Sequence, residues 1–348
     1  GARPQFIKLM PVAREVARRR QTGADSIDHM VVHTGQHYDF EMSQAFFDRL
    51  ELPSAQYHLG IGSGDHGQQT GRMLEGIEGV LSKESPDVVV VYGDTNSTLA
   101  GSLAAAKLHI TSAHVEAGLR SYNRDMPEET NRVVSDHVSD ILLCPSETAV
   151  ENLRREGLAR LVDHDSLVNR NGAGEPVQLP VVVNVGDVMY DALLISVDIA
   201  AEQSRILEKL AAEPCEYLLA TVHRAENTDN LDRLRQILTA LSELSKERRV
   251  ILPLHPRTRK AIETGKDELG LDLSGLDMIA PVDYLDMLWL TKNARAVLTD
   301  SGGLQKECYW LGVPCVTLRD ETEWTETVDA GANVLAGAEH QRIVGAVR

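Results

Sequence analysis

Short apolar runs of strand length, each followed by a stretch with helical character, recur along this sequence of 348 residues. β-branched residues dominate these runs, and the segments between them are long enough for a helix that crosses back over a sheet. Because such alternation is typical of parallel strands in repeated βα units, we predict an α/β protein with two doubly wound parallel sheets. The runs that we expect to form strands are 29–33, 87–92, 109–115, 141–144, 181–185, 217–222, 249–254, 278–280, 296–299 and 315–318.

A turn-rich stretch without clear periodicity divides the sequence near its middle. Residues 159–180 include Asn-Arg-Asn-Gly-Ala-Gly-Glu-Pro, a composition typical of a linker or a surface insertion. We therefore predict an N-terminal domain over residues 1–158 and a C-terminal domain over residues 181–336. A last helix within residues 337–348 could cross back to the first domain. Residues 1–4 look like a loop that follows a strand, so we expect the protein to have further residues before them.

The charge balance and the cysteine content exclude several classes of protein. The chain has 35 Lys and Arg against 52 Asp and Glu, a formal charge of −17, whereas a nucleic-acid surface must be basic. The longest apolar runs, such as residues 88–91, have the length of a strand, so we expect no span through a membrane. The 4 cysteines lack the paired spacings of a zinc site or a disulfide framework, which predicts no metal site and favours a reducing cytoplasm.

A polar segment follows the predicted strand 87–92, at the edge where ligands bind in open parallel sheets. Its residues are Gly-Asp-Thr-Asn-Ser-Thr, and either Thr95 or Ser97 can serve as the cap of the next helix. Capping does not account for Asp94, whose carboxylate at a strand end can act on a bound substrate. We therefore predict a functional role for Asp94.

Carboxylates and arginines also gather after the predicted strand 109–115. Glu116 follows this strand directly, and Glu128 and Glu129 come after Pro127. Carboxylates whose surroundings set their pKa values apart can serve as acid and base. Proline followed by two glutamates also matches the start of a helix, where acidic residues suit the dipole. For Glu129 we favour the helix-start interpretation, whereas for Glu116 and Glu128 the sequence leaves both interpretations open.

A glycine-rich turn in the second half is suited to an anion. Ser301, Gly302 and Gly303 follow the predicted strand 296–299 and open a helix, whose first N–H groups and dipole attract negative charge. An ordinary serine N-cap with a glycine-rich entry turn explains the same residues equally well. Glu307 in this helix could accept hydrogen bonds from the hydroxyls of a ribose, or it is a plain exposed glutamate.

Cations near two element ends point to a negatively charged ligand. His223 and Arg224 follow the predicted strand 217–222, and such a pair can clamp a diphosphate. Arg3 and Lys8 lie at the start of the first predicted helix, where cations oppose the dipole. A ligand phosphate or an acidic side chain of the protein should therefore lie near them.

Taken together and in this order, these motifs resemble the non-hydrolysing UDP-N-acetylglucosamine 2-epimerase family. The matching segments are GARPQFIK (1–8), GQHYD (35–39), GDTNS (93–97), HVEAGLR (114–120), PEE (127–129), HRAEN (223–227) and DSGGLQKE (300–307). The resemblance implies two Rossmann-like domains that face each other across a cleft, as in glycosyltransferase-B folds, with the C-terminal domain binding UDP. It also implies an enzyme that interconverts the gluco and manno forms of a UDP-N-acetylamino sugar at C2 without an external cofactor.

Carried over by position, the resemblance assigns roles to individual residues. It implies that Asp94, Glu116 and Glu128 are acid/base or orienting carboxylates and that His223 assists at the diphosphate. The residues that it implies for substrate binding are Arg3, Lys8, Arg132, Ser301, Gly302, Gly303 and Glu307. Loss of UDP would give a 2-acetamidoglucal-like intermediate, and return of UDP would give the epimer. Membership would further imply a cytoplasmic homodimer that supplies sugars for surface polysaccharide.

Two departures from the family pattern leave the substrate open. Trp324 stands where the most familiar members have an arginine that contacts the nucleotide. Residues 118–123 and 125–127 look more like the branch that acts on UDP-2,3-diacetamido-2,3-dideoxyglucuronate. A nucleotide-sugar glycosyltransferase of the same two-domain shape is a further alternative, against which the carboxylates Asp94, Glu116 and Glu128 argue.

Overall fold

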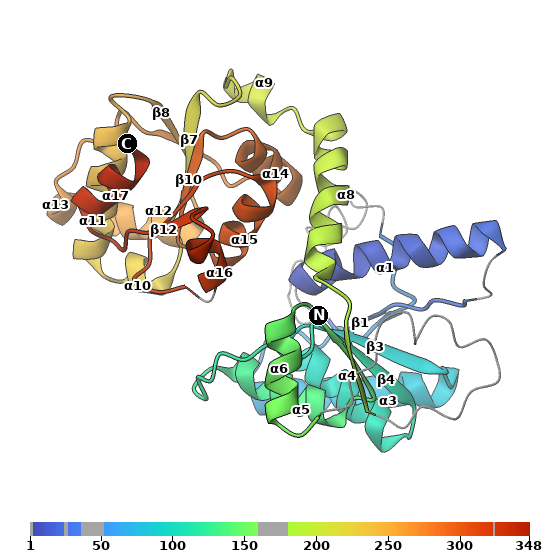
Figure 1. Ribbon diagram of the computed structural model, residues 1–348. Coiled ribbons are helices and arrows are strands. Elements are labelled where there is room, and N and C mark those ends of the chain that lie inside the picture. Colours follow the sequence, from blue (N-terminus) through green and yellow to red (C-terminus); the bar gives the residue numbers. More distant parts are fainter. Residues whose placement is uncertain (1–2, 24–26, 36–51, 159–179, 323) are drawn as a thin grey trace. The chain divides into compact units, whose positions relative to one another are not determined.

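The alternation of strands and helices that the sequence predicts is present in both halves of the chain. The computed structural model describes residues 3–23, 27–35, 52–158, 180–322 and 324–348. The chain divides into two compact units, Gly1–Ala192 and Leu193–Arg348, each with parallel strands and helices (Figure 1). Most of the predicted insertion 159–180 and most of the motif at 35–39 lie outside the described residues. None of the helices in the described ranges is long and apolar enough to cross a bilayer.

A four-stranded parallel sheet forms the centre of the first unit. Its strands, in spatial order, are β3 (Val88–Tyr92), β4 (Thr111–Val115), β5 (Ile141–Cys144) and β6 (Val181–Asn184), and β1 (Val32–His33) pairs separately with β2 (Tyr57–His58). The helices are α1 (Arg3–Thr22), α3 (His66–Glu84), α4 (Asn96–Lys107), α5 (Pro127–Val138) and α6 (Glu147–Arg155). Met73, Ile77 and Leu81 of α3 pack in one cluster with Ala100 and Ala104 of α4. The small alanines allow the two helices to approach closely.

The boundary between the units lies later in the chain than the sequence predicts. Strand β6 pairs with β5, with Ile141 beside Val181 and Cys144 beside Asn184, so it belongs to the first sheet. The prediction that residue 181 begins the second domain is therefore wrong. An apolar run indicates a strand but does not encode its hydrogen-bonding partner. The division into units falls after Ala192, within α8 (Val188–Gln203).

The second unit is built on a six-stranded parallel sheet. Its spatial order is β12 (Asn333–Leu335), β11 (Cys315–Thr317), β10 (Ala296–Thr299), β7 (Tyr217–Thr221), β8 (Arg249–Pro253) and β9 (Asp277–Ile279). Numbered along the chain from β7, this is the Rossmann order 3-2-1-4-5-6 read from β9. The chain runs from β7 outward to β9 and then returns to the other side of β7 with β10. The point where the order reverses therefore lies between β7 and β10, where such sheets bind their ligands.

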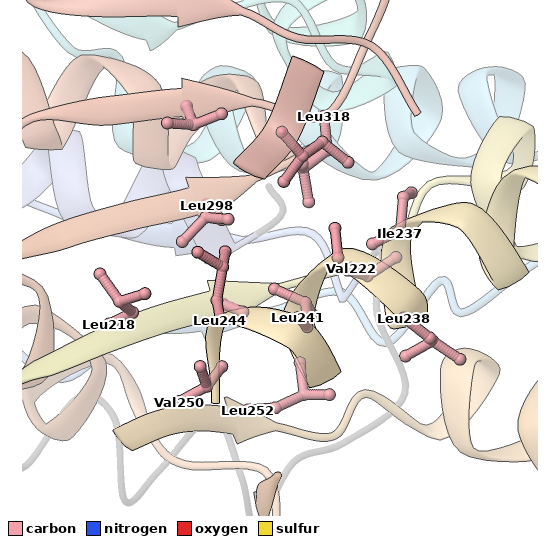
Figure 2. Packing of buried hydrophobic residues seen from close by; sticks show 14 of the residues in the cluster. Leu218, Val222, Ile237, Leu238, Leu241, Leu244, Val250, Leu252, Leu298 and Leu318 are labelled. Atoms are coloured by element: carbon pink, nitrogen blue, oxygen red, sulfur yellow. The ribbon is translucent and has the colours of Figure 1, made fainter. Parts of the chain in front are cut away.

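Helices pack on both faces of this sheet because alternate residues of its strands point in opposite directions. They are α9 (Ile206–Leu210), α10 (Ala225–Thr228), α11 (Leu231–Leu244), α12 (Pro256–Thr264), α13 (Lys266–Leu269), α14 (Tyr284–Lys292), α15 (Gly302–Leu311), α16 (Thr325–Asp329) and α17 (His340–Val347). Leu218 of β7 packs with residues of α11, including Leu241 and Leu244 (Figure 2). The neighbouring Leu219 belongs instead to the cluster that contains Leu304 of α15.

The last helix stays with the second unit. Ile343 and Val344 of α17 are buried in the same cluster as Leu241 and Leu244 of α11. The expectation that a helix within residues 337–348 crosses back to the first domain is therefore not met. The apolar face of α17 packs against apolar side chains of α11 and of the second sheet.

A buried histidine at the end of β1 makes the first unit sensitive to acid. The ring of His33 stacks on Phe6 with 4.8 Å between ring centroids and lies 5.1 Å from the ring of His58. Its Nδ1 accepts a hydrogen bond of 2.9 Å from the backbone N–H of Gly35. Burial, together with nearby positive charge that includes His58, lowers the pKa of His33 from 6.5 to about 4.

We expect the protein to lose stability as the pH falls below 6.5 towards about 4, the ordinary and the folded pKa of His33. In that window the unfolded chain binds a proton that the folded chain does not. The contribution of His33 to the free energy of unfolding is therefore fully present above the window and is lost below it. The loss from this group amounts to up to about 3 kcal/mol. Urea unfolding at about pH 7 and about pH 5 should show a smaller difference in His33→Asn, whose Oδ1 can still accept from Gly35. An equal pH dependence in this variant would contradict the assignment.

Candidate active site

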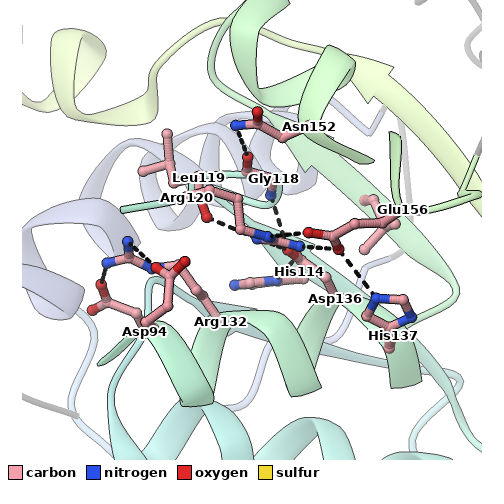
Figure 3. Close-up of polar contacts among 12 residues, drawn as sticks. Asp94, His114, Gly118, Leu119, Arg120, Arg132, Asp136, His137, Asn152 and Glu156 are labelled. Atoms are coloured by element: carbon pink, nitrogen blue, oxygen red, sulfur yellow. Dashed lines mark hydrogen bonds and ion pairs between the residues drawn. The ribbon is translucent and has the colours of Figure 1, made fainter. Parts of the chain in front are cut away.

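Asp94 is held by two consecutive residues of α5. It lies two residues after the end of β3, at the sheet edge where the sequence predicts it. Its carboxylate forms an ion pair with the guanidinium of Arg132 (Figure 3). Its backbone carbonyl accepts a hydrogen bond of 3.0 Å from Nδ2 of Asn131. The arginine that the resemblance assigns to substrate binding therefore also orients a predicted catalytic carboxylate.

Glu129 is a buried organising residue rather than a helix-start charge alone. Its carboxylate accepts hydrogen bonds from the backbone N–H groups of Ser121 and Tyr122, both at 2.9 Å, and from the Ser121 hydroxyl at 2.8 Å. It also lies 3.1 Å from the guanidinium of Arg132. Burial acts to raise the pKa of Glu129, but these hydrogen bonds and the arginine outweigh it, so the pKa is lowered. Glu128, on the same turn, is exposed, and its catalytic role stays a prediction.

Glu116 and Lys8 form a close ion pair at the end of β4. The ammonium of Lys8 lies 2.6 Å from the carboxylate of Glu116, and both side chains are largely buried. Lys8 lies in α1, so the negative neighbour that its position calls for is Glu116. Glu15, the acidic residue within α1 itself, pairs with Arg18 and Arg19 instead. Arg3 begins α1, but its side chain lies outside the part of the chain that is described.

Two backbone conformations near this ion pair are unusual. Glu116 has φ +75°, in the left-handed region that non-glycine residues avoid at a cost of about 1–3 kcal/mol. Gly93, between β3 and Asp94, has φ +67°. A Cβ at Gly93 would lie 2.9 Å from the side-chain nitrogen of Gln5 and 3.1 Å from that of Lys8. A glycine at this position therefore allows α1 to bring its polar side chains against the end of β3.

A chain of ionisable side chains, fully buried at His114 and Asp136, links β4, α5 and α6 of the same unit (Figure 3). Asp136 of α5 lies 2.7 Å from Nδ1 of His114 and accepts a hydrogen bond of 2.7 Å from Arg120. Arg120 continues to Glu156 through two hydrogen bonds of 2.6 and 2.7 Å, and Glu156 contacts His137 at 3.1 Å. Burial acts to raise the pKa of Asp136, but His114 and Arg120 outweigh it, so the pKa is lowered.

In the second unit, a fully buried aspartate organises the ends of β7 and β10. Asp300, directly after β10, accepts hydrogen bonds of 2.9 Å from the backbone N–H groups of His223 and Arg224 and of 3.1 Å from Nδ2 of Asn227. The ring Nδ1 of His223 lies 3.2 Å from Asp300 Oδ1. Burial lowers the pKa of His223, although the charge of Asp300 acts in the opposite direction. Asp300 was not predicted as a functional residue, although it directly follows a strand, the same signal that singles out Asp94.

The first turn of α15 has the features of an anion site. Ser301 is the N-cap, and its hydroxyl accepts from the backbone N–H of Leu304 at 3.4 Å. The amides of Gly302 and Gly303 lie in this first turn, where N–H groups have no acceptor within the helix. A Cβ added to Gly303 would meet no atom within 4 Å, so there is open space beside the backbone. Glu307 lies further along the same helix and is half-buried.

A lysine lies where the sequence departs from the family pattern. The ammonium of Lys306 lies 4.1 Å from the ring centroid of Trp324 and 4.8 Å from that of Trp310. Such cation–π contacts hold a positive charge in place. The tryptophan that replaces the expected arginine is therefore accompanied by another cation. Within the part of the chain that the structure describes, no three His, Cys, Asp or Glu side chains are grouped as metal ligands.

The fold and these sites define a two-unit α/β enzyme, with paired carboxylates at strand ends in the first unit and a glycine-rich helix start in the second. The chain belongs to the UDP-N-acetylglucosamine 2-epimerase family, which matches residues 19–348, and it is an isomerase.

Known relatives match this chain over nearly its whole length. A UDP-N-acetylglucosamine 2-epimerase homolog of Methanococcus maripaludis is 50% identical over 99% of this chain and 89% of its own. The UDP-2,3-diacetamido-2,3-dideoxy-D-glucuronate 2-epimerase of Pseudomonas aeruginosa is 49% identical over 100% of this chain and 90% of its own. A crystal structure of Methanocaldococcus jannaschii UDP-GlcNAc 2-epimerase in complex with UDP-GlcNAc and UDP has a TM-score of 0.77 at 44% identity, covering 99% of this chain and 89% of that one.

Proposed function

We propose that this protein interconverts UDP-N-acetylglucosamine and UDP-N-acetylmannosamine at C2, as a cytoplasmic homodimer that supplies sugars for surface polysaccharide. The observation that carries the proposal is the placement of Asp94 and Glu116, in a chain of this family, at the carboxyl ends of neighbouring strands. Each carboxylate is paired with a cation, Arg132 or Lys8, that keeps it in place.

The chemistry requires that UDP leaves before the C2 proton is exchanged. The C2 hydrogen is not next to a carbonyl group, so its direct removal is slow. When the bond between C1 and the phosphate oxygen breaks, its electron pair leaves with UDP and C1 gains oxocarbenium character, which acidifies the C2 hydrogen. Transfer of that proton to a carboxylate gives a 2-acetamidoglucal. Addition of a proton to the opposite face and return of UDP to C1 give the epimer, so the sequence balances without a cofactor.

Proton removal and return on opposite faces of the sugar call for more than one acid/base group. We assign these transfers to Asp94, Glu116 and Glu128, which supply carboxylates from two strand ends and one helix start. Arg132 and Lys8 orient the first two of them. Their positive charges would also stabilise negative charge on the departing UDP.

Binding of UDP is assigned to residues of the second unit. The first-turn amides of Gly302 and Gly303, capped by Ser301, would receive the diphosphate, because a helix start favours negative charge. His223, oriented by its contact with a buried aspartate, would donate to the same phosphates. Glu307 would accept hydrogen bonds from the ribose hydroxyls. Arg3 would add a further cation to substrate binding from the start of α1.

A second candidate substrate is UDP-2,3-diacetamido-2,3-dideoxyglucuronate, with the same reaction at C2. The relative from Pseudomonas aeruginosa that bears this substrate in its name is 49% identical to the chain. The tryptophan at residue 324, whose ring lies against Lys306, also distinguishes this chain from the more familiar family pattern.

Proton NMR of the protein with UDP-N-acetylglucosamine in D2O tests this proposal. We expect the manno epimer to form with deuterium at C2, because the proton that returns comes from a carboxylate that exchanges with solvent, while UDP and free sugar stay minor. No reaction on this substrate, but epimerisation of the diacetamido uronate, would select the second candidate. Release of free N-acetylmannosamine, or no epimer from either sugar, would overturn the proposal.

A further inference from the structure

The buried carboxylate of Asp136 contacts residues on both sides of Glu116. Its Oδ1 lies 2.7 Å from Nδ1 of His114, two residues before Glu116. Its Oδ2 accepts a hydrogen bond of 3.1 Å from the backbone N–H of Gly118, two residues after Glu116. Glu116 itself has φ +75°, a strained conformation for a residue with a Cβ. Such strain persists only where the surroundings over-determine it. The two contacts of Asp136 supply that restraint at both ends of the turn.

The same carboxylate reaches Asp94 through a histidine ring. Nε2 of the fully buried His114 lies 2.7 Å from the backbone carbonyl oxygen of Gly93, the residue directly before Asp94. A carbonyl can only accept, so Nε2 carries a proton. The other ring nitrogen, Nδ1, lies 2.7 Å from Oδ1 of Asp136, whose Oδ2 accepts hydrogen bonds from Gly118 and Arg120. His114 thus joins the ends of β3 and β4 to Asp136.

We propose that Asp136 is a positioning residue for the epimerisation, which fixes Glu116 through residues 114 and 118 and fixes the backbone of Asp94 through His114. It touches no reacting atom itself. The inference rests on the proposed function, because only there do Asp94 and Glu116 act on the sugar. A misplacement of about 1 Å in a reacting group can cost about 100-fold in rate, so a restraint behind both carboxylates matters for turnover.

The opposite end of the buried chain provides a matched control. Glu156 forms two hydrogen bonds with Arg120, on the side of the guanidinium away from Asp136, and its side chain is 27% exposed. Among the described residues its carboxylate contacts Arg120 and His137, and not residues 114 to 118 or Gly93. Glu156→Gln therefore weakens the same buried network by one charge without releasing the turn of Glu116.

The test compares Asp136→Asn with Glu156→Gln in the full chain. We expect kcat to fall about 100-fold in Asp136→Asn, with the KM for the UDP-sugar and the Kd of UDP unchanged. Glu156→Gln should keep the kcat of the wild type. Equal kcat values in the two variants, or a loss confined to KM, would overturn the positioning role. If Asp136→Asn does not fold, His114→Gln serves in its place, because glutamine can still donate to the Gly93 carbonyl but not to Asp136 as well.

A spectroscopic measurement tests the hydrogen bond through which His114 reaches the backbone before Asp94. In ¹⁵N-histidine-labelled wild-type protein, the ring of His114, identified by its absence from His114→Gln, should carry a proton on Nε2, which faces the Gly93 carbonyl. A ring without a proton on Nε2 in the wild type would overturn the inference. Failure of the proposed function is recognised separately, because the wild type would then epimerise neither UDP-sugar, whereas failure of the inference leaves wild-type turnover intact.

Discussion

Replacement of Asp94 by asparagine is expected to lower kcat about 1,000- to 10,000-fold, the upper range for the loss of a general acid or base. The amide keeps the shape of the side chain and one oxygen towards Arg132, but it can neither take up nor return a proton at C2. UDP affinity should stay close to that of the wild type, because the groups assigned to UDP binding lie mainly in the second unit. Epimerisation followed by NMR, with UDP binding by calorimetry, checks both expectations.

Asp140→Asn is the matched control for this experiment. Asp140 belongs to the same unit and accepts a hydrogen bond of 2.8 Å from the backbone N–H of Ser112, but it precedes β5 and so lies at the amino ends of the strands. Ligands bind at the opposite edge of such sheets, so this variant should keep its kcat. Full activity in Asp94→Asn, or an equal loss in both variants, would remove Asp94 from the proposed mechanism.

The fold could be predicted where strands carry their own signal. All ten runs predicted as strands overlap one, because the strands of parallel sheets are rich in apolar residues. The two strands that were missed, β2 and β12, have two and three residues, too few for any period. The boundary prediction was wrong for a different reason. The sheet to which β6 belongs is set by its pairing with β5, a contact between residues far apart in the sequence that no local pattern encodes.

Some residues of the candidate site could be predicted from the sequence, and others could not. Asp94, Glu116 and His223 could be found because each follows a strand, and the ends of parallel strands share one edge of the sheet. Glu129 and Asp136 could not be found, because both lie in α5 and their importance comes from burial against a loop and a strand. A charge within a helix is exposed in most proteins, so its pattern alone does not distinguish it.

Gly118→Ala is expected to destabilise the first unit by about 3 to 5 kcal/mol, because two penalties add. Gly118 has φ +81°, and a Cβ there would lie 2.4 Å from the backbone oxygen and 2.8 Å from the backbone carbon of Ala149. Both atoms belong to the main chain of α6, so they can move only with the helix. The N–H of Gly118 also donates to Asp136, so any shift would loosen the turn that carries Glu116.

Gly79→Ala separates this local clash from a general effect of adding a methyl group. Gly79 lies within α3 at a helical φ, and a Cβ there would meet no atom within 4 Å. Alanine should therefore stabilise the protein by about 0.5–1 kcal/mol, because glycine loses more backbone entropy in a helix. Urea unfolding of the two variants should show shifts of opposite sign. If Gly118→Ala unfolds like the wild type, α6 does not pack against the turn of Glu116 as described, and the restraint on that turn must come from elsewhere.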